Sequence, residues 1–231
     1  SAKVKFESPN KNINSWPKSF GKAMIGYAEK LARLKPDLAI ITGDRIETLA
    51  FSITCAYMNI PIAHTMGGEV SGTIDESIRH AITKFAHIHF PACEGAKERI
   101  IKLGEEPSHV HMVGCPRIDL IADLISNKNF GLNSNIFSLG VGSPICLDKP
   151  FVLISQHPVT TEYGEGEKQI MITLEAVRDL ELPAIVLWPN SDAGSDDISK
   201  GIRKWRELKL DDNMHFFKNL PIEDYILLMT K

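Results

Sequence analysis

Residues 66–79, which read MGGEVSGTIDESIR, concentrate polar chemistry between an apolar run and a helical pattern. The segment holds two adjacent glycines, three carboxylates and an arginine. Glycine lets the backbone approach a ligand closely, and a helix that begins here would present its N-terminus to an anion. The segment therefore predicts a phosphate or carboxylate site over residues 72–75, where Glu69 and Asp75 would suit general acid–base chemistry.

The start of this helix has a structural interpretation as well. Residues 73–76 (TIDE) fit the S/T-x-x-E capping box, which predicts Thr73 as the N-cap and Glu76 reaching back to it. The apolar residues that follow fall on one helix face, at Ile78, Ala81, Ile82 and Phe85. Arg79 and Thr83 are left on the more polar side, where we expect them to face a ligand or solvent.

Apolar runs of strand length alternate with helical patterns along the chain. A helix is predicted over 19–34, and the predicted strands are 38–42, 61–64, 87–91, 109–113, 151–155 and 184–188. This alternation favours an α/β fold with parallel sheets and right-handed crossovers. A stretch rich in Asn, Gly and Ser between 126 and 149 marks a boundary. We expect an N-terminal α/β domain with its linker over 1–149, and a partial C-terminal α/β domain over 150–231.

Polar residues follow the predicted strands at the places where ligands bind in open parallel sheets. The sets are Gly43-Asp44-Arg45, Gly67-Gly68-Glu69, Gly114 to Arg117, Gln156-His157-Pro158 and Pro189 to Asp192. Each has a plainer interpretation: Asp44 could cap the helix beginning near Ile46, His157 could bond its own loop, and Arg117 could be solvated surface. Their convergence on one rim favours a ligand site.

Composition and missing motifs exclude several functional classes. The net charge of −3 and its mixed distribution give no footprint for nucleic acid or a membrane, and no apolar run is long enough to span a bilayer or to form a signal peptide. Four cysteines without CxxC spacing indicate reduced, buried thiols of a cytoplasmic protein. His87 with His89, and His109 with His111, alternate as strand residues would. The histidines form no metal motif, and we expect them to pack in or beside the sheet. P-loop, GxGxxG and G-x-S-x-G motifs are absent.

Five strings together resemble the hydrolysing UDP-N-acetylglucosamine 2-epimerases of sialic-acid biosynthesis. They are GDRIETLA (43–50), GGEVSGTIDESIRHAITKFAHIHF (67–90), GCPRIDLI (114–121), QHPVTTE (156–162) and WPNSDAGS (188–195). The resemblance implies a GT-B-like fold, with two doubly wound parallel-sheet domains and a nucleotide sugar in the cleft between them. It implies elimination of UDP followed by addition of water, which yields N-acetylmannosamine, and no metal or redox cofactor. A cytoplasmic homo-oligomer, dimer or tetramer, is expected.

The resemblance assigns roles to individual residues. Asp44 and Asp75 match acidic catalytic positions, and His157 matches the histidine that approaches the diphosphate. With Glu69, the predicted catalytic set is Asp44, Glu69, Asp75 and His157. The predicted substrate-binding set is Arg45, Gly67, Gly68, Arg79, Arg117, Gln156, Asn190 and Asp192.

Met66 departs from the family pattern, because the glycine pair is often preceded there by a glutamate that is a candidate base. A thioether cannot take a proton, so either Glu69 substitutes, the activity is weak, or the substrate differs. A less polar surface would suit UDP-2,4-diacetamido-2,4,6-trideoxyglucose of the legionaminic-acid route, which is the alternative substrate.

The chain also looks incomplete at both ends. The family's arginine-containing phosphate loop would precede Ser1 and its serine-rich nucleotide loop would follow Lys231, so we expect the chain alone to be inactive. A glycosyltransferase, a non-hydrolysing epimerase and a non-catalytic nucleotide-sugar-binding remnant stay open. The non-hydrolysing epimerase is disfavoured because its H-V-E-A-G-L-R string is absent.

Overall fold

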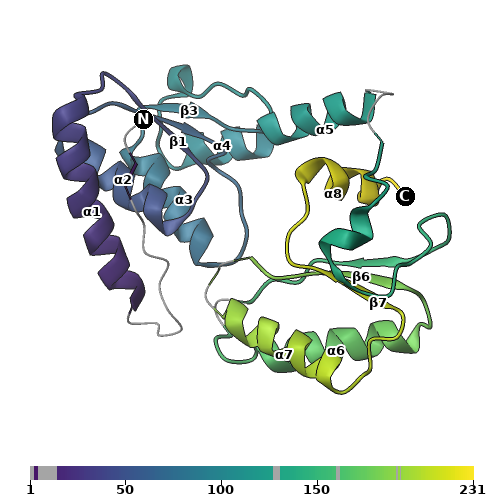
Figure 1. Cartoon of the computed structure of the whole chain (residues 1–231). Helices are drawn as coiled ribbons and strands as arrows, with labels where there is room; N and C mark the ends of the chain where they lie inside the picture. The colour runs from purple at the N-terminus through teal and green to yellow at the C-terminus, as the bar shows by residue number, and fades with distance from the viewer. Residues whose placement is uncertain (1–2, 5–14, 127–130, 160–161, 191, 193) are drawn as a thin grey trace. The chain divides into compact units, whose positions relative to one another are not determined.

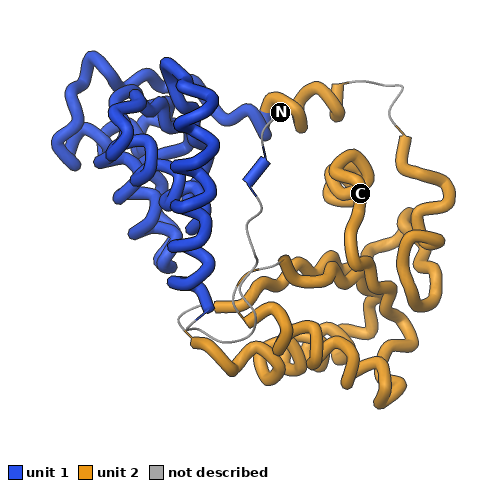
Figure 2. Tube along the Cα trace, turned by 60° about the vertical axis from the view of Figure 1, so that its left-hand side comes forward, with its two compact units in different colours: residues 1–118 blue, residues 119–231 orange. Residues whose placement is uncertain are grey.

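The chain divides into two compact units, residues 1–118 and 119–231, in the computed structural model (Figures 1 and 2). The structure describes residues 3–4, 15–126, 131–159, 162–190, 192 and 194–231. Each unit contains its own β-sheet and its own hydrophobic core.

Unit 1 contains three parallel strands in the order β1-β2-β3, which are Ala39–Thr42, Ile62–Thr65 and Ile88–Phe90. Its helices are α1 (Ser15–Leu34), α2 (Ile46–Tyr57), α3 (Ile74–Phe85) and α4 (Glu94–Lys102). Thr42 at the end of β1 pairs in register with Thr65 at the end of β2. The loops that follow these two strands therefore start side by side at the carboxyl edge of the sheet.

The core of unit 1 forms where α1, α2 and α3 pack on the sheet. Ile62 on β2 and Ile82 on α3 are completely buried. Burial of an isoleucine side chain of this kind contributes roughly 1.5–3 kcal/mol. This packing fixes α3 against the strands, and so fixes the polar residues in the first turns of that helix.

Unit 2 contains a four-stranded sheet in the order β4-β7-β6-β5. The strands are β4 (Val141–Gly142), β5 (Val152–Ile154), β6 (Ala184–Leu187) and β7 (Met214–Phe217), and only β4 is antiparallel to its neighbour. The helices are α6 (Gly166–Asp179), α7 (Ser195–Glu207) and α8 (Ile222–Met229). Phe216 packs in the α6–α7 core and Phe217 in a second core with Leu228 of α8, so this sheet is covered on both faces.

Residues 131–149 lie in unit 2, and the division falls within α5 (Pro116–Ser126), earlier than the boundary expected at 149. The segment forms a short 3-10 helix, Ile136–Leu139, whose Ile136 is buried with Phe217. Its β4 then pairs with β7. Asn133 also donates its backbone N–H to Asp224 Oδ1 at 3.0 Å. This segment therefore has the composition of a loop but contains β4, the edge strand of the sheet.

Several smaller expectations were wrong. The predicted strand 109–113 is instead a 3-10 helix, Pro107–His109, followed by a single bridge between Val110 and His89. The strands β4 and β7 were not predicted. Cys55 is buried as expected, but Cys93 and Cys146 are exposed. No helix in the described ranges is long and apolar enough to cross a bilayer.

Candidate functional site

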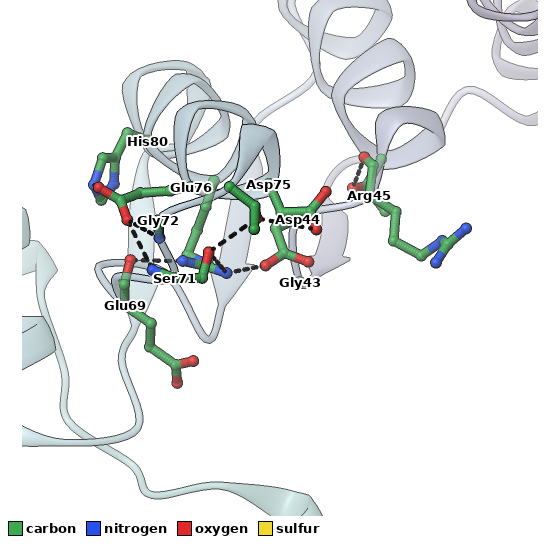
Figure 3. Close-up of polar contacts among 12 residues, drawn as sticks. Gly43, Asp44, Arg45, Glu69, Ser71, Gly72, Asp75, Glu76 and His80 are labelled. Atoms are coloured by element: carbon green, nitrogen blue, oxygen red, sulfur yellow. Dashed lines mark hydrogen bonds and ion pairs between the residues drawn. The ribbon is translucent and has the colours of Figure 1, made fainter. Parts of the chain in front are cut away.

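An ion pair joins the loop after β1 to helix α3. Arg79 donates through Nη2 to the carboxylate of Asp44 and through Nη1 to the backbone carbonyl of Glu69 at 2.6 Å (Figure 3). The arginine is 5% exposed, whereas the side chain of Asp44 is 27% exposed. A buried guanidinium requires such partners. Arg79 therefore holds a partly accessible carboxylate at the carboxyl edge of the sheet. Arg79 and Thr83 were expected to face a ligand or solvent, and the burial of both residues excludes solvent.

The two glycines after β2 pack against protein rather than lining open space. Gly67 and Gly68 are buried. Gly68 has φ +79°, and a Cβ at this position would lie 2.3 Å from the carbonyl oxygen of Ala96 on α4. Arg99 of the same helix donates to the Gly68 carbonyl. The glycine pair thus seats this loop tightly on α4.

Glu76 secures the loop that leads into α3. Its Oε2 accepts the backbone N–H groups of Ser71 and Gly72 at 2.7 and 2.8 Å. These backbone hydrogen bonds lower the pKa of Glu76 below its ordinary value. Thr73 is the N-cap as predicted, but Glu76 reaches past it and Thr73 makes no side-chain capping bond. Glu76 therefore supports the loop as an ionised carboxylate.

Asp75 lies in the first turn of α3, one helical turn before Arg79. Its Oδ2 is 3.5 Å from the hydroxyl of Thr73. The position at i and i+4 places Asp75 and Arg79 on the same side of the helix. In unit 1, Asp44 therefore contacts the buried Arg79, and Asp75 lies one helical turn before Arg79 on the same side of α3.

His64 lies beneath these loops and is completely buried in β2. Its Nε2 is 2.9 Å from the carbonyl oxygen of Gly43, the residue before Asp44. A carbonyl can only accept, so Nε2 carries the proton and donates it. Burial lowers the pKa of His64 to about 4.

Two predicted residues of unit 1 are adjacent to the ion pair in sequence but point elsewhere. Arg45 is the N-cap residue of α2, a position predicted for Asp44, and its Nε lies 2.8 Å from Glu47 Oε1. Figure 3 shows Arg45 extending away from Asp44, and it shows the Glu69 carboxylate pointing away from that pair as well. Glu69 contributes its carbonyl to Arg79 rather than its acid.

Arg117 is exposed in the first turn of α5. Within the described ranges, no recorded hydrogen bond or ion pair connects Arg117 to the Asp44–Arg79 pair. The structure therefore leaves Arg117 outside this set of contacts.

A second group of predicted residues meets in unit 2, after β5 and β6. The backbone N–H of Asn190 donates to His157 Nδ1 at 3.3 Å. The side chain of Asn190 in turn bonds Asp192, whose own N–H donates to Asn190 Oδ1 at 3.2 Å. Because Nδ1 accepts, a neutral His157 carries its proton on Nε2, which lies 3.5 Å from the hydroxyl oxygen of Ser155 and could instead donate to an anionic group. Gln156 is half-buried beside this exposed histidine.

Sequence analysis missed His64 and Arg99 as parts of the site. His64 had the expected role of a packed histidine, and only its position just before the glycine loop could have drawn attention to it. Arg99 lies in an ordinary charged helix, so its bond to Gly68 follows from tertiary packing alone. Among the described residues, no group of three or more His, Cys, Asp or Glu side chains is placed to hold a metal ion.

Comparison with known proteins gives one consistent family. Residues 2–231 match the model of the UDP-N-acetylglucosamine 2-epimerase family. The chain is 34% identical over 202 residues to the UDP-N,N'-diacetylbacillosamine 2-epimerase (hydrolyzing) of Legionella pneumophila, covering 85% of the chain and 50% of that protein. It is 31% identical over 215 residues to the UDP-N-acetylglucosamine 2-epimerase of Neisseria meningitidis, covering 89% and 52%. The chain therefore spans about half the length of these curated relatives.

Solved structures agree at the level of the fold. The crystal structure of UDP-GlcNAc 2-epimerase from Neisseria meningitidis bound to UDP-GlcNAc has a TM-score of 0.76 at 19% identity, covering 97% of this chain and 60% of that one. A Methanocaldococcus jannaschii structure, in complex with UDP-GlcNAc and UDP, has a TM-score of 0.74 at 16% identity, covering 95% and 59%. The fold is GT-B-like, with two α/β units built on parallel strands, as predicted.

Proposed function

Because the chain belongs to the UDP-N-acetylglucosamine 2-epimerase family, we propose that the whole protein is a hydrolysing UDP-sugar 2-epimerase. The observation that carries this proposal is the carboxylate of Asp44, held by the buried Arg79 at the carboxyl edge of a parallel sheet. Ligands of open α/β sheets bind at this edge. A fixed carboxylate there is suited to proton transfer on a bound sugar.

The proposed reaction has two steps. A carboxylate takes the proton from the second carbon of the sugar, the electrons form a double bond to the first carbon, and UDP leaves with the electrons of its C–O bond. Water then adds its hydroxyl to the first carbon, and a proton returns to the second carbon from the opposite face. The products are UDP and a sugar with inverted configuration at the second carbon.

Asp44 and Asp75 are the proposed proton-transfer groups, because both accompany Arg79 in unit 1. Glu69 is proposed as a further proton-transfer group, a role that requires its carboxylate to rotate from the direction seen in Figure 3. In unit 2, His157 is proposed to donate to the diphosphate, because its Nδ1 already accepts from Asn190. Diphosphate is a good leaving group when donors stabilise its developing charge.

The remaining predicted residues are proposed to contact the rest of the nucleotide sugar. They are Arg45, Arg117, Gln156, Asn190 and Asp192, whereas the buried Gly67 and Gly68 are proposed to act by shaping the loop after β2. We propose that the protein acts in the cytoplasm as a homo-oligomer, a dimer or a tetramer, and that it uses neither a metal nor a redox cofactor.

Two substrates are proposed. UDP-N-acetylglucosamine, which would yield N-acetylmannosamine for sialic-acid biosynthesis, is the first. UDP-2,4-diacetamido-2,4,6-trideoxyglucose is the second, because Met66 places a thioether where the family pattern has an acid and because the Legionella relative is named for this sugar nucleotide. An apolar side chain suits a sugar that lacks a hydroxyl.

The test is UDP release by the full-length protein, offered the two nucleotide sugars in parallel, with Asp44→Asn as the control. Turnover of the first sugar alone assigns the sialic-acid route, and turnover of the second alone connects Met66 with a deoxy substrate. Equal UDP release by Asp44→Asn and the wild type, or no release by either, would contradict the catalytic proposal. The protein would then be one that binds a nucleotide sugar without catalysis. The 231-residue chain on its own is expected to release no UDP.

A further inference from the structure

We propose that His64 is a positioning residue, which aims Asp44 by holding the Gly43 carbonyl from inside the sheet. This inference rests on the proposed function, since it concerns how the proposed catalytic carboxylate is held. The contact is the 2.9 Å bond from Nε2 to the Gly43 oxygen. Asp44 follows Gly43 directly, so a rotation of that peptide would swing the carboxylate.

The backbone at Gly43 depends on such an anchor. Gly43 has φ +79°, and a Cβ added there would meet nothing within 4 Å. Its backbone N–H makes only a long bond, 3.4 Å, to the carbonyl of Thr65. A glycine in open space with one weak backbone bond is free to change conformation. The buried imidazole supplies the second, shorter constraint.

The same ring also contacts the glycine loop. A Cβ on Gly67 would lie 2.9 Å from His64 Nδ1 and 3.2 Å from Thr83 Oγ1. Nδ1 is buried and has no hydrogen-bond partner among the described residues. His64 is therefore wedged between the loop after β1 and the loop after β2. Arg79 joins the same two loops from the other side, through Asp44 and the Glu69 carbonyl.

Neutral imidazole fits this role, because an unpartnered Nδ1 can stay buried only without a proton. The desolvation of the ring lowers its pKa, the Gly43 bond and the Asp44 carboxylate raise it, and electrostatic interactions with His89 and Arg79 lower it. Burial dominates this balance. His64 thus keeps one tautomer, with its donor aimed at Gly43, throughout the neutral range.

The test compares His64→Leu, which removes the donor, with His64→Gln, whose amide nitrogen can replace Nε2. Both are made in the full-length protein. The matched control is His215→Leu, because His215 is also buried and also bonds a backbone carbonyl, that of Gly142 at 3.1 Å, in unit 2. Misplacement of a reacting group by about 1 Å costs about 100-fold in rate.

The expected result is a fall in kcat of about 100-fold for His64→Leu with little change in KM, and recovery of most of that loss in His64→Gln. His215→Leu should lose comparable stability but keep its kcat. Similar kcat values for His64→Leu and the wild type, or equal losses in the two leucine variants, would overturn the inference. Asp44→Asn separates the two proposals: if it loses activity while His64→Leu keeps it, only the positioning role fails.

Discussion

Arg79 reaches Asp44 across 35 residues of sequence, from a position almost completely buried in α3. The pair connects a helix to the end of a strand that it does not directly follow. Asp44 thereby gains a fixed direction that its own loop does not impose.

Substitution of Arg79 by Ala should destabilise the 231-residue chain by roughly 3 kcal/mol, because it leaves Asp44 and the Glu69 carbonyl without their partner. Urea unfolding measures this change. Arg45→Ala is the matched control, since its pair with Glu47 is exposed and should be worth less than about 1 kcal/mol. Similar losses in the two variants would show that the buried pair has no special importance for stability.

Gly68 and Gly72 provide a second comparison. Both have positive φ, +79° and +66°, but a Cβ on Gly68 would collide with the Ala96 carbonyl whereas one on Gly72 meets nothing within 4 Å. Gly72→Ala should cost about 1–2 kcal/mol from backbone strain. Gly68→Ala should cost roughly 3 kcal/mol or more, because overpacking is added to the strain. Equal free energies of unfolding would mean that α4 moves aside at little cost.

Stability should fall in mild acid because of His64. Burial lowers its pKa from 6.5 to about 4, so the unfolded chain binds a proton that the folded chain refuses. The stability that depends on a neutral His64 is fully present above pH 6.5. It is lost as the pH falls toward 4, by up to about 3 kcal/mol. The pKa of His89 is also lowered by burial, which adds a loss of the same sign.

The measurement for this acid effect is the free energy of unfolding, taken at steps of roughly one pH unit from about pH 7.5 to about pH 4.5, a range that brackets the ordinary histidine pKa. His64→Gln should show a shallower decline than the wild type, since glutamine does not titrate. Parallel curves would place the acid sensitivity in other groups.

The cysteines should differ sharply in reactivity. Cys93 and Cys146 are exposed and Cys115 is half-buried, whereas burial raises the pKa of Cys55 to about 11. An aromatic disulfide reagent should therefore label Cys93 and Cys146 first, and should reach Cys55 only after denaturation. The double variant Cys93→Ser/Cys146→Ser should lose the fast phase; retention of that phase would contradict the exposures.

Much of the site was predictable because it follows from strand-to-loop order. Parallel strands place their carboxyl ends at one edge, so the sequence pointed to Asp44 after β1 and to the Gly67–Gly68 loop after β2. The amphipathic pattern likewise predicted α3 and its N-cap, Thr73. These features depend on local sequence and on one rule of topology.

What could not be predicted depends on contacts between distant residues. Nothing in the composition around Arg99 indicates that it supports Gly68 from α4. Arg45 is a local exception, because it pairs with Glu47, two residues further on, and points away from Asp44 (Figure 3). Residues 131–149 resemble a linker because the partners of their few apolar anchors, such as Ile136, lie far along the chain, at Ile185, Phe217 and Leu228.

The pairing of β4 with β7 implies an order of assembly during synthesis. His215 bonds Gly142 across 73 residues, whereas Thr42 and Thr65 of the unit 1 sheet meet across 23. Contacts between distant residues close slowly, and domains tend to form as the chain emerges. The three strands of unit 1 can therefore pair while β7 is still being translated. Until then β4 has no strand to pair with, because β7 is the only neighbour it has among the described residues.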